Sequence, residues 1–286
     1  MPGRRIDLHT HSAVSDGSDS PADLVRKAAA LGLEAVALTD HDTLDGLDEA
    51  EAAADRLPIR FIRGCELAVH DPRQGELHLL GLWMPPPSEA MRAALRGIQE
   101  HRAQRNRNIL RRLRALGMPL SLDDVLAHSR GVVPGRPHIA KALREKGYVK
   151  SAAEAFRLYI GEGKSAFFPR TLLTPETGIR LLAAEGATVA LAHPFLHSSM
   201  TPDILADLLP ECQAYGLTAL EVYHSAHSDS DVRAGLLLAE AHGLFPTGGS
   251  DYHGAFKPGV CLGSPRVPGI LLDRLEAHRK GKRPKR

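Results

Sequence analysis

The sequence predicts an α/β protein in which helices alternate with buried strands, arranged as a barrel or as an open parallel sheet. Two observations support this fold class. The segments 20–39, 174–192 and 201–223 share one order: Ser-Pro or Thr-Pro, a helical pattern, a glycine and then a strand. Their strands are apolar throughout, as in AVAL, TVALA and TALEV, which is typical of strands covered on both faces.

Each repeated unit carries its own helix start and stop signals. Ser20, Thr174 and Thr201 can cap a helix, and the proline after each fits the first helical position. The glycine that ends each pattern suits the left-handed residue after a helix. We expect helices over 20–32, 174–186, 201–216 and about 229–242. We expect strands over 34–39, 59–69, 76–84, 187–192, 217–223 and 244–253, after a first strand that ends at His9 and His11.

Residues 91–166 interrupt this alternation after the three prolines at 85–87, which we interpret as a linker. Apolar residues recur there at helical spacing. We therefore predict a small helical insert, 91–166, in a barrel domain formed by 1–90 and 167–286, and expect the insert to shape substrate choice. The insert helices are expected over about 91–116, 121–129, 136–146 and 151–161.

The composition is that of a globular protein, with 43% hydrophobic and 24% charged residues. No stretch approaches the roughly 18 apolar residues that a membrane span requires, so we expect a cytoplasmic protein that does not bind membranes. The three cysteines, Cys65, Cys212 and Cys261, are isolated from one another. They favour neither a disulfide framework nor a structural zinc site.

Positive charge is concentrated in two segments. Residues 92–114 carry eight arginines and one acid, Glu100, while residues 279–286 carry six Lys or Arg. A solvated helix face would account for many of these arginines, but the excess indicates an anionic substrate or partner. The segment 279–286 is predicted to be a disordered basic tail whose affinity for RNA would be nonspecific. We expect no binding to double-stranded DNA and no protein partner.

Metal-ligand side chains end nearly every predicted strand. His9 and His11 lie two residues apart, so they face the same side of a strand and can hold one ion. Imidazole and carboxylate donors without thiolate suit Zn, Mn or Fe as Lewis acids. About nine donors are too many for one ion, so a cluster with Glu66 as a bridge is predicted. The candidate ligands are His9, His11, Asp16, His41, Glu66, His78, His193, Asp251 and His253.

These residues fall in motifs: His9-Thr10-His11, Asp16-Gly17, Thr39-Asp40-His41-Asp42, Glu66, Glu76-x-His78, His193-Pro194 and Ser250-Asp251-x-His253. Together they resemble the PHP (polymerase and histidinol phosphatase) family of metallophosphoesterases. The resemblance spans both flanks of the insert and implies a distorted (β/α)7 barrel with three divalent ions, manganese before iron or zinc. The implied ligand sets are His9, His11, Glu66 and Asp251; Glu66, His78 and His193; and Asp16, His41 and His253.

Within the insert, the stretches 101–110, 135–147 and 161–170 resemble the PHP branch that contains nucleoside 3',5'-bisphosphate phosphatases and a 5'→3' exoribonuclease. This implies a phosphohydrolase that converts a substrate such as 3'-phosphoadenosine 5'-phosphate to AMP and phosphate by attack of a metal-bound hydroxide. On this hypothesis basic residues bind the 5'-phosphate, and a guanidinium can do so bidentately. The candidate substrate-binding residues are Arg102, Arg105, Gly135, Arg136, Lys164 and Arg170.

Three alternative functions stay open. The first is 5'→3' exoribonuclease action on short RNA, and the second is a histidinol-phosphate-type phosphatase, which the arginine-rich insert disfavours. The third is a noncatalytic metal-bound scaffold or RNA-binding module, which the complete ligand set disfavours.

Several polar residues near the candidate ligands have alternative interpretations. Asp40 either orients a ligand imidazole or caps a helix with Asp42. Glu221 and His224 either lie at the rim or contact the substrate. His197 is either an acid that reaches the substrate or an exposed loop residue.

Overall fold

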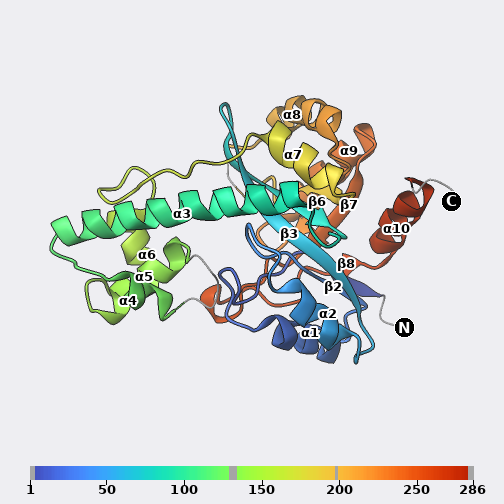
Figure 1. Ribbon diagram of the computed structural model, residues 1–286. Helices are drawn as coiled ribbons and strands as arrows, with labels where there is room; N and C mark the ends of the chain where they lie inside the picture. The colour runs from blue at the N-terminus through green and yellow to red at the C-terminus, as the bar shows by residue number, and fades with distance from the viewer. Residues whose placement is uncertain (1–3, 129–133, 197–198, 283–286) are drawn as a thin grey trace.

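A computed structural model describes residues 4–128, 134–196 and 199–282. Its strands form one sheet in the order β7-β6-β5-β4-β3-β2-β1-β8, which curls into a nearly closed barrel (Figure 1). The two edges of the barrel wall meet where the Leu8 amide donates a hydrogen bond to the Gly248 carbonyl at 3.1 Å and Thr10 pairs with Tyr252. The predicted α/β barrel is therefore confirmed.

The sheet is mixed because β3 and β4 form a long antiparallel hairpin. The strands β1, β2 and β3 run parallel, as do β5, β6 and β7, whereas β4 is antiparallel to both of its neighbours. The short β8 pairs antiparallel with β1. The strands are β1 Arg5–Asp7, β2 Ala35–Leu38, β3 Arg60–Asp71, β4 Gly75–Leu82, β5 Thr188–Leu191, β6 Ala219–His224, β7 Phe245–Gly249 and β8 Val267–Pro268.

The outer helices begin and end where the sequence signals predict. The side chains of Ser20, Thr174 and Thr201 each accept a hydrogen bond from the amide three residues later. Gly32 and Gly186 take positive φ angles of 69° and 78° after their helices, a conformation that favours glycine. The helices of the barrel domain are α1 Pro21–Ala30, α2 Leu47–Ala54, α7 Pro175–Ala184, α8 Pro202–Tyr215, α9 Asp229–Ala241 and α10 Ile270–Lys282.

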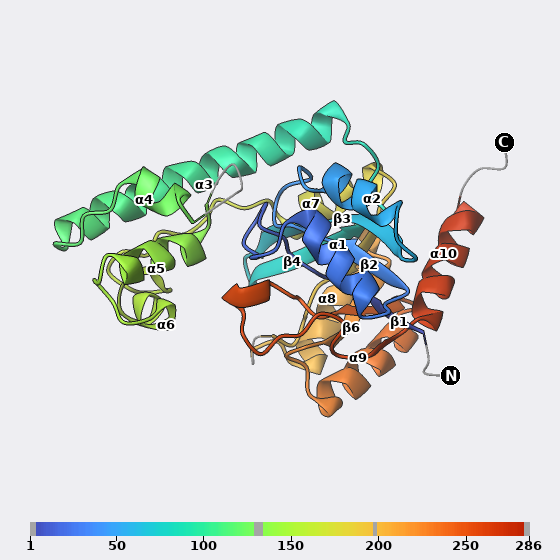
Figure 2. The same ribbon diagram turned by 90° about the horizontal axis from the view of Figure 1, so that it is seen from below.

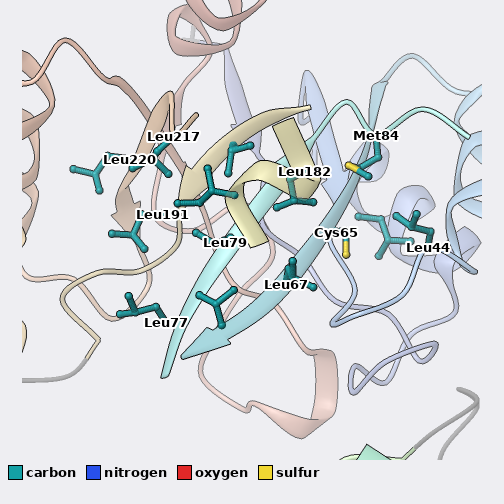
Figure 3. Close-up of a cluster of buried hydrophobic side chains, with 14 of the residues drawn as sticks. Leu44, Cys65, Leu67, Leu77, Leu79, Met84, Leu182, Leu191, Leu217 and Leu220 are labelled. Atoms are coloured by element: carbon teal, nitrogen blue, oxygen red, sulfur yellow. The ribbon is translucent and has the colours of Figure 1, made fainter. Parts of the chain in front are cut away.

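The main hydrophobic core lies between the barrel wall and the outer helices. Leu67 of β3, Leu79 of β4 and Leu191 of β5 point outward and pack in one cluster with Leu182 of α7 (Figure 3). All four side chains are buried. This core fixes the outward face of each strand, so the alternate residues point into the barrel.

The barrel interior forms a second core, which α10 closes at one end. Leu271, Leu272 and Leu275 of α10 pack against inward-facing residues of the strands. Polar contacts tie the helix to the starts of three parallel strands: Arg4 to Asp273 at 2.8 Å, Arg60 to Glu276 at 3.0 Å, and Arg279 to the Gly186 carbonyl at 2.9 Å. The opposite end of the barrel, where the parallel strands finish, is left for the candidate ligands.

The first part of the predicted basic tail is helical. Residues 279–282 complete α10, because Arg279 is held by the Gly186 carbonyl and lies over the Trp83 ring at 4.9 Å. Residues 283–286 lie outside the described part of the chain.

The helical insert shares its longest helix with the barrel. The first half of α3, Glu89–Ala115, contributes Met91, Leu95 and Ile98 to the main core. The second half extends beyond the barrel and contributes Ile109 and Leu113 to a separate small core (Figures 1 and 2). The other helices of that core are α4 Leu122–Leu126, α5 Arg136–Glu145, α6 Ala152–Ala155 and the π-helical turn Phe156–Ile160.

No helix within the described ranges is long and apolar enough to cross a membrane.

Substitutions in α10 test its role as the closure of the barrel. Leu272 is fully buried, so Leu272→Ala should lower the free energy of unfolding by about 2–5 kcal/mol through lost contacts and a residual cavity. Ile270 in the same helix is 54% exposed, and Ile270→Ala should change the free energy of unfolding by less than about 0.5 kcal/mol. Denaturant unfolding measures both values. Equal effects of the two substitutions would contradict the packing described here.

Candidate metal centre and the adjacent arginine cluster

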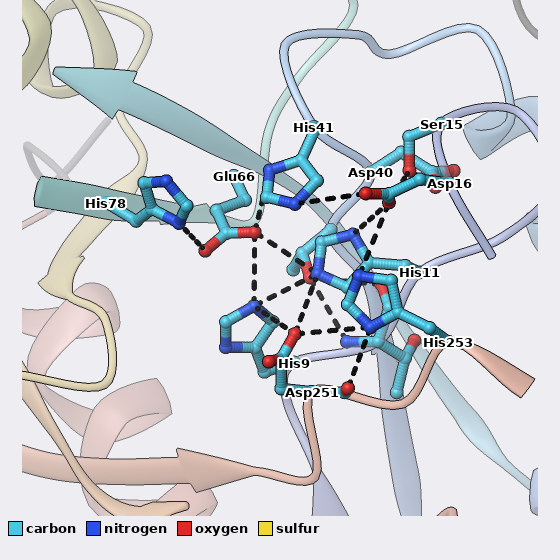
Figure 4. Close-up of polar contacts among 12 residues, drawn as sticks. His9, His11, Ser15, Asp16, Asp40, His41, Glu66, His78, Asp251 and His253 are labelled. Carbon is cyan, nitrogen blue, oxygen red and sulfur yellow. Dashed lines mark hydrogen bonds and ion pairs between the residues drawn. The ribbon is translucent and has the colours of Figure 1, made fainter. Parts of the chain in front are cut away.

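The candidate centre is built around the carboxylate of Glu66, which lies on β3 and is fully buried. Five imidazoles from four segments of the barrel face its two oxygens, and Figure 4 shows those of His9, His11, His41 and His78. The nitrogen–oxygen distances are 2.8 Å to His78, 3.0 Å to His41 and His193, 3.1 Å to His11 and 3.3 Å to His9. One buried anion therefore organises imidazoles from β4, from the loop after β2, from the loop after β5 and from the segment after β1.

Asp251 extends this arrangement on the side of β7. Its Oδ1 atom lies 3.2 Å from Nε2 of His11 and 3.5 Å from Nε2 of His9, while Lys257 contacts Oδ2 at 2.5 Å. Asp251 has a φ of 56° and His193 a φ of 26°, which are left-handed values that non-glycine residues rarely adopt. Backbone strain at two candidate ligands is typical of functional sites.

Asp16 and His253 form the outer part of the centre. Asp16 lies 3.3 Å from Nε2 of His253, 3.7 Å from Nε2 of His41 and 3.8 Å from Nδ1 of His11. Gly17 permits this loop, because a Cβ atom there would lie 2.2 Å from the His11 carbonyl oxygen. All nine predicted ligands thus come together at this end of the barrel, and Figure 4 labels eight of them, all except His193.

The donor geometry fits divalent ions. Donor atoms of His9, His11 and Asp251 lie within 4.8 Å of one another, as do those of His11, Asp16, His41 and His253. The first group lacks the Glu66 of the corresponding implied set, and the second contains the implied set of Asp16, His41 and His253 together with His11. Two further groups share Glu66: one with His9 and His193, the other with His41 and His78. Glu66 Oε2 and His11 Nδ1 are buried without a hydrogen-bond partner in the described ranges, as expected of atoms that face an ion.

The carboxylates and imidazoles of the centre stabilise each other's charge. Burial opposes ionisation of Glu66, but His41, His9 and His78 outweigh it and hold its pKa well below the usual range. Burial would lower the pKa of His11, but Asp251 and Glu66 raise it to about 10. At His193 burial dominates and lowers the pKa to about 4. A divalent cation would compensate the same carboxylates and bind the imidazoles in their neutral form.

Glu221 supports the ligands from behind. It is fully buried, and neither the rim position nor the substrate contact predicted for it is observed. Its oxygens lie 3.0 and 3.1 Å from Nδ1 of His9 and accept the amide of His193 at 2.7 Å. A carboxylate behind a ligand imidazole fixes the ring orientation and raises its basicity. Because Glu221 follows Leu220 on β6, strand alternation alone places it inward.

Two other supporting carboxylates also differ from the sequence interpretation. Asp40 accepts hydrogen bonds from the amide and hydroxyl of Ser12 and from the hydroxyl of Ser15, so it shapes the loop before Asp16 rather than orienting an imidazole. Asp7, which the sequence analysis missed, accepts the amides of Ser250 and Gly263 at 2.8 and 2.7 Å. It ties β1 to the segment that carries Asp251.

His224 is buried beside Asp251 instead of lying at the rim. Its Nδ1 atom accepts the amide hydrogen of Ala226 at 3.1 Å, so the proton of the neutral ring is on Nε2. Nε2 lies 3.4 Å from Oδ2 of Asp251. His224 therefore faces the ligand carboxylate at ion-pair distance, and its Nε2 atom has no hydrogen-bond partner among the described residues. His197 lies outside the described residues.

Gly249 allows the two edges of the barrel to meet at the centre. A Cβ atom at this position would lie 2.4 Å from both the backbone nitrogen and the Cβ of His9. The absence of a side chain at this residue therefore lets the chain approach the candidate centre closely.

A cavity of about 780 Å³ lies next to the centre and contains three of the predicted substrate-binding arginines. Arg105 of α3, Arg136 of α5 and Arg170 line it. The Arg136 guanidinium lies over the rings of Phe156 and Phe167, at 5.8 and 5.6 Å. Three cations from separate segments thus face one space between the insert and the barrel.

The remaining predicted substrate-binding residues occupy different positions. Arg102 lies one turn before Arg105 on α3 and pairs with Asp42 beside the cavity. Gly135 precedes α5, where its amide donates to Nδ1 of His138 at 3.0 Å. Lys164 is exposed in the loop after the π-helical turn and is not among the residues that line the cavity.

The carboxylate of Glu76 connects the cavity to the candidate centre. Glu76 lines the cavity and pairs with Arg170, while its Oε1 atom lies 3.1 Å from Nε2 of His78. The other nitrogen of His78 faces Glu66 at 2.8 Å. The arginine cavity and the metal-ligand cluster are therefore adjacent and are connected through Glu76.

Known proteins with similar sequences identify the family. Residues 7–119 match the PHP domain. The chain is 34% identical to the 3',5'-nucleoside bisphosphate phosphatase of Chromobacterium violaceum over 259 residues, which cover 90% of each chain. The protein belongs to the PHP family. This confirms the resemblance that the ligand motifs predicted.

Other PHP relatives agree on the class of reaction. The 5'-3' exoribonuclease of Haemophilus influenzae is 34% identical, over 87% of this chain and 90% of its own length. A solved structure from Bifidobacterium adolescentis, assigned as a metal-dependent phosphoesterase, superposes with a TM-score of 0.87 at 30% identity and covers 96% of both chains. The protein is a phosphoesterase, and its cluster of His, Asp and Glu is suited to divalent metal ions.

Substitution of Glu221 tests whether its carboxylate helps the ligand His9 to bind metal. Glu221→Gln keeps the side-chain volume but weakens the interaction with His9, so affinity for Mn²⁺ should fall by about tenfold or more. Glu211 forms an exposed ion pair with Arg73, and Glu211→Gln is the matched control that should leave Mn²⁺ binding unchanged. Isothermal titration of the metal-free protein measures both. Wild-type affinity in the Glu221 variant would contradict this role.

Proposed function

We propose that this PHP protein removes the 3'-phosphate from nucleoside 3',5'-bisphosphates, such as 3'-phosphoadenosine 5'-phosphate. The proposal depends mainly on the burial and incomplete hydrogen bonding of Arg105. Its side chain is buried, its Nε atom has no hydrogen-bond partner among the described residues, and the one side-chain hydrogen bond that it donates there is to Asn106 at 3.3 Å. Burial, together with Arg170, Arg102 and Arg136, lowers the pKa of Arg105 to about 9. A buried cation in this position gains from a bound anion.

The proximity of the arginine cavity to the metal-ligand cluster supports a substrate with two phosphate groups. The N-terminus of α5 lies between the two sites: Arg136 lines the arginine cavity, and Pro137 lines the mouth of the metal-ligand cluster. Asp16, His41, Glu66 and Asp251 line the same mouth. One phosphate in the cavity and one at the cluster would belong to one small molecule. The 5'-phosphate is assigned to the arginines and the 3'-phosphate to the cluster.

Each part of the site has a distinct task in this reaction. The nine candidate ligands hold the divalent ions, which when bound supply Lewis-acid chemistry that activates water and neutralises phosphoryl oxygens. Arg105, Arg136 and Arg170 bind the 5'-phosphate and orient the ribose. Glu221, Asp40 and Asp7 hold the ligand-bearing segments in place. Manganese is the proposed metal, with three ions as the family resemblance implies.

The relatives support the same substrate class and also a second candidate. The Chromobacterium violaceum relative is named as a 3',5'-nucleoside bisphosphate phosphatase, and the Haemophilus influenzae relative as a 5'-3' exoribonuclease, at the same 34% identity. Exoribonuclease action on short RNA would use the same arginines for a terminal 5'-phosphate. The scissile phosphate would then be a diester at the metal-ligand cluster.

Arg105 tests the recognition of the 5'-phosphate. Arg105→Met should lower kcat/KM for a nucleoside 3',5'-bisphosphate by roughly 30-fold or more, because it removes a buried cation that pairs with the substrate (about 2 kcal/mol or more). Hydrolysis of the corresponding 3'-monophosphate should be unaffected. Arg111 lies on the same helix, bonds to Asn108 and is exposed, so Arg111→Met is the matched control. Phosphate-release assays compare the two substrates. A preference of the wild-type protein for simple phosphomonoesters would contradict the substrate assignment.

Length dependence separates the two candidate reactions. With Mn²⁺ present, a nucleoside 3',5'-bisphosphate should be hydrolysed with a higher kcat/KM than 5'-phosphorylated RNA of three to five nucleotides, and a chelator should abolish both activities. Chromatographic analysis of products over time measures the two rates. Faster stepwise shortening of the RNA would favour the exoribonuclease.

A further inference from the structure

Asp42 lies between the candidate metal centre and the arginine cavity but belongs to neither. It follows His41 directly and is 1% exposed. Its Oδ2 atom pairs with Arg102 of the insert and lies 3.8 Å from Arg170, which lines the cavity. Its Oδ1 atom accepts the amide hydrogen of Ala68 at 3.2 Å. One buried carboxylate of the barrel therefore holds two of the predicted substrate-binding arginines.

The backbone fixes the direction of this carboxylate. Asp42 adopts a left-handed φ of 54°, and its amide donates to the Glu66 carbonyl at 2.9 Å. Its own carbonyl accepts a hydrogen bond from the side chain of Gln99, on α3, at 3.4 Å. A strained conformation that is held by contacts on both sides leaves the side chain little freedom. The position of Asp42 is thus set by the same strand that presents Glu66.

The arginines need such a partner because they repel one another. Arg102, Arg105, Arg136 and Arg170 form a group in which the charges of the other three help to lower the pKa of Arg105. Long cationic side chains in this arrangement would otherwise turn toward solvent, where each has many rotamers. Asp42 is the only carboxylate that contacts Arg102 in the described ranges. Without it, the group would lose the order that a phosphate requires.

We infer that Asp42 is a positioning residue that sets the preference for substrates with a second, 5'-terminal phosphate. It acts through Arg102 and Arg170, which it holds at the edge of the cavity, and it takes no part in hydrolysis itself. The inference rests on the proposed function, because it assigns the support of the same 5'-phosphate site. The side chain of Asp40, on the other side of His41, accepts hydrogen bonds from Ser12 and Ser15 and has no bond to the described part of the insert.

The substitution Asp42→Asn isolates this role. Asparagine tolerates the left-handed backbone and keeps an oxygen for the Ala68 amide, so the variant loses the charge and not the fold. KM for a nucleoside 3',5'-bisphosphate should rise about tenfold while kcat stays the same, an effect in the range of other supporting residues. KM and kcat for the 3'-monophosphate, and the dependence of activity on Mn²⁺ concentration, should not change. A structural defect transmitted through His41 would alter all of these values.

Two comparisons complete the experiment. Asp23→Asn removes a carboxylate from the exposed pair with Arg26 and should leave both substrates unaffected. In an Arg102→Met background, Asp42→Asn should raise KM for the bisphosphate by much less than in the wild type, because part of its effect passes through Arg102. Equal losses on both substrates, tighter binding of the bisphosphate, or full additivity with Arg102→Met would each overturn the inference.

The wild type separates this inference from the proposed function. If the wild-type protein does not prefer the bisphosphate to the 3'-monophosphate, the proposed function fails and the inference fails with it. If the wild type has this preference and Asp42→Asn retains it, only the role of Asp42 is overturned.

Discussion

The burial of one carboxylate among five imidazoles is the constraint on which the rest of the site depends. Glu66 is fully removed from solvent, and an unpaired carboxylate there would be strongly destabilising. Its partners come from segments that are distant in the sequence, so the barrel must close before the charge is compensated. Asp7 and Gly249 serve that closure by bringing β1 and the end of β7 together. The requirements of the fold and those of the metal site are therefore met by the same contacts.

The residues proposed to recognise the substrate and the candidate metal ligands lie on different parts of the chain. Acidic side chains connect the two groups. The barrel supplies the candidate ligands, and α3 and α5 of the insert supply Arg105 and Arg136. Glu76 and Asp42 pair with arginines of the cavity while being bonded to the strands that carry the ligands. Because α3 packs into both hydrophobic cores, the insert is held in a defined position over the barrel. A change of substrate preference can thus arise in the insert without disturbing the metal-ligand cluster.

Local patterns in the sequence predicted most of the fold and all nine candidate ligands. Ligands at strand ends, Ser-Pro and Thr-Pro starts and terminal glycines each act within a few residues, so a single chain reveals them. The sequence analysis missed α2, which starts at Leu47 after Gly46, a residue that offers no side-chain cap, and α10, whose buried leucines pack against the barrel interior. It also left open Glu221, Asp40 and His224, because what they touch comes from distant segments. Their contacts depend on register and closure, which no local pattern encodes.

The closure of the barrel by α10 has a consequence for the order of events in a catalytic cycle. Leu271, Leu272 and Leu275 fill the end of the barrel below α10. Molecules that reach the metal-ligand cluster therefore enter through the opening bordered by Pro137 and His253. Substrate, ions and both products would use this same opening. Under the proposed function, a nucleotide product held by the arginines would lie beside this opening, where phosphate leaves and the next substrate enters. Release of that product would then compete with entry of new substrate and could limit turnover.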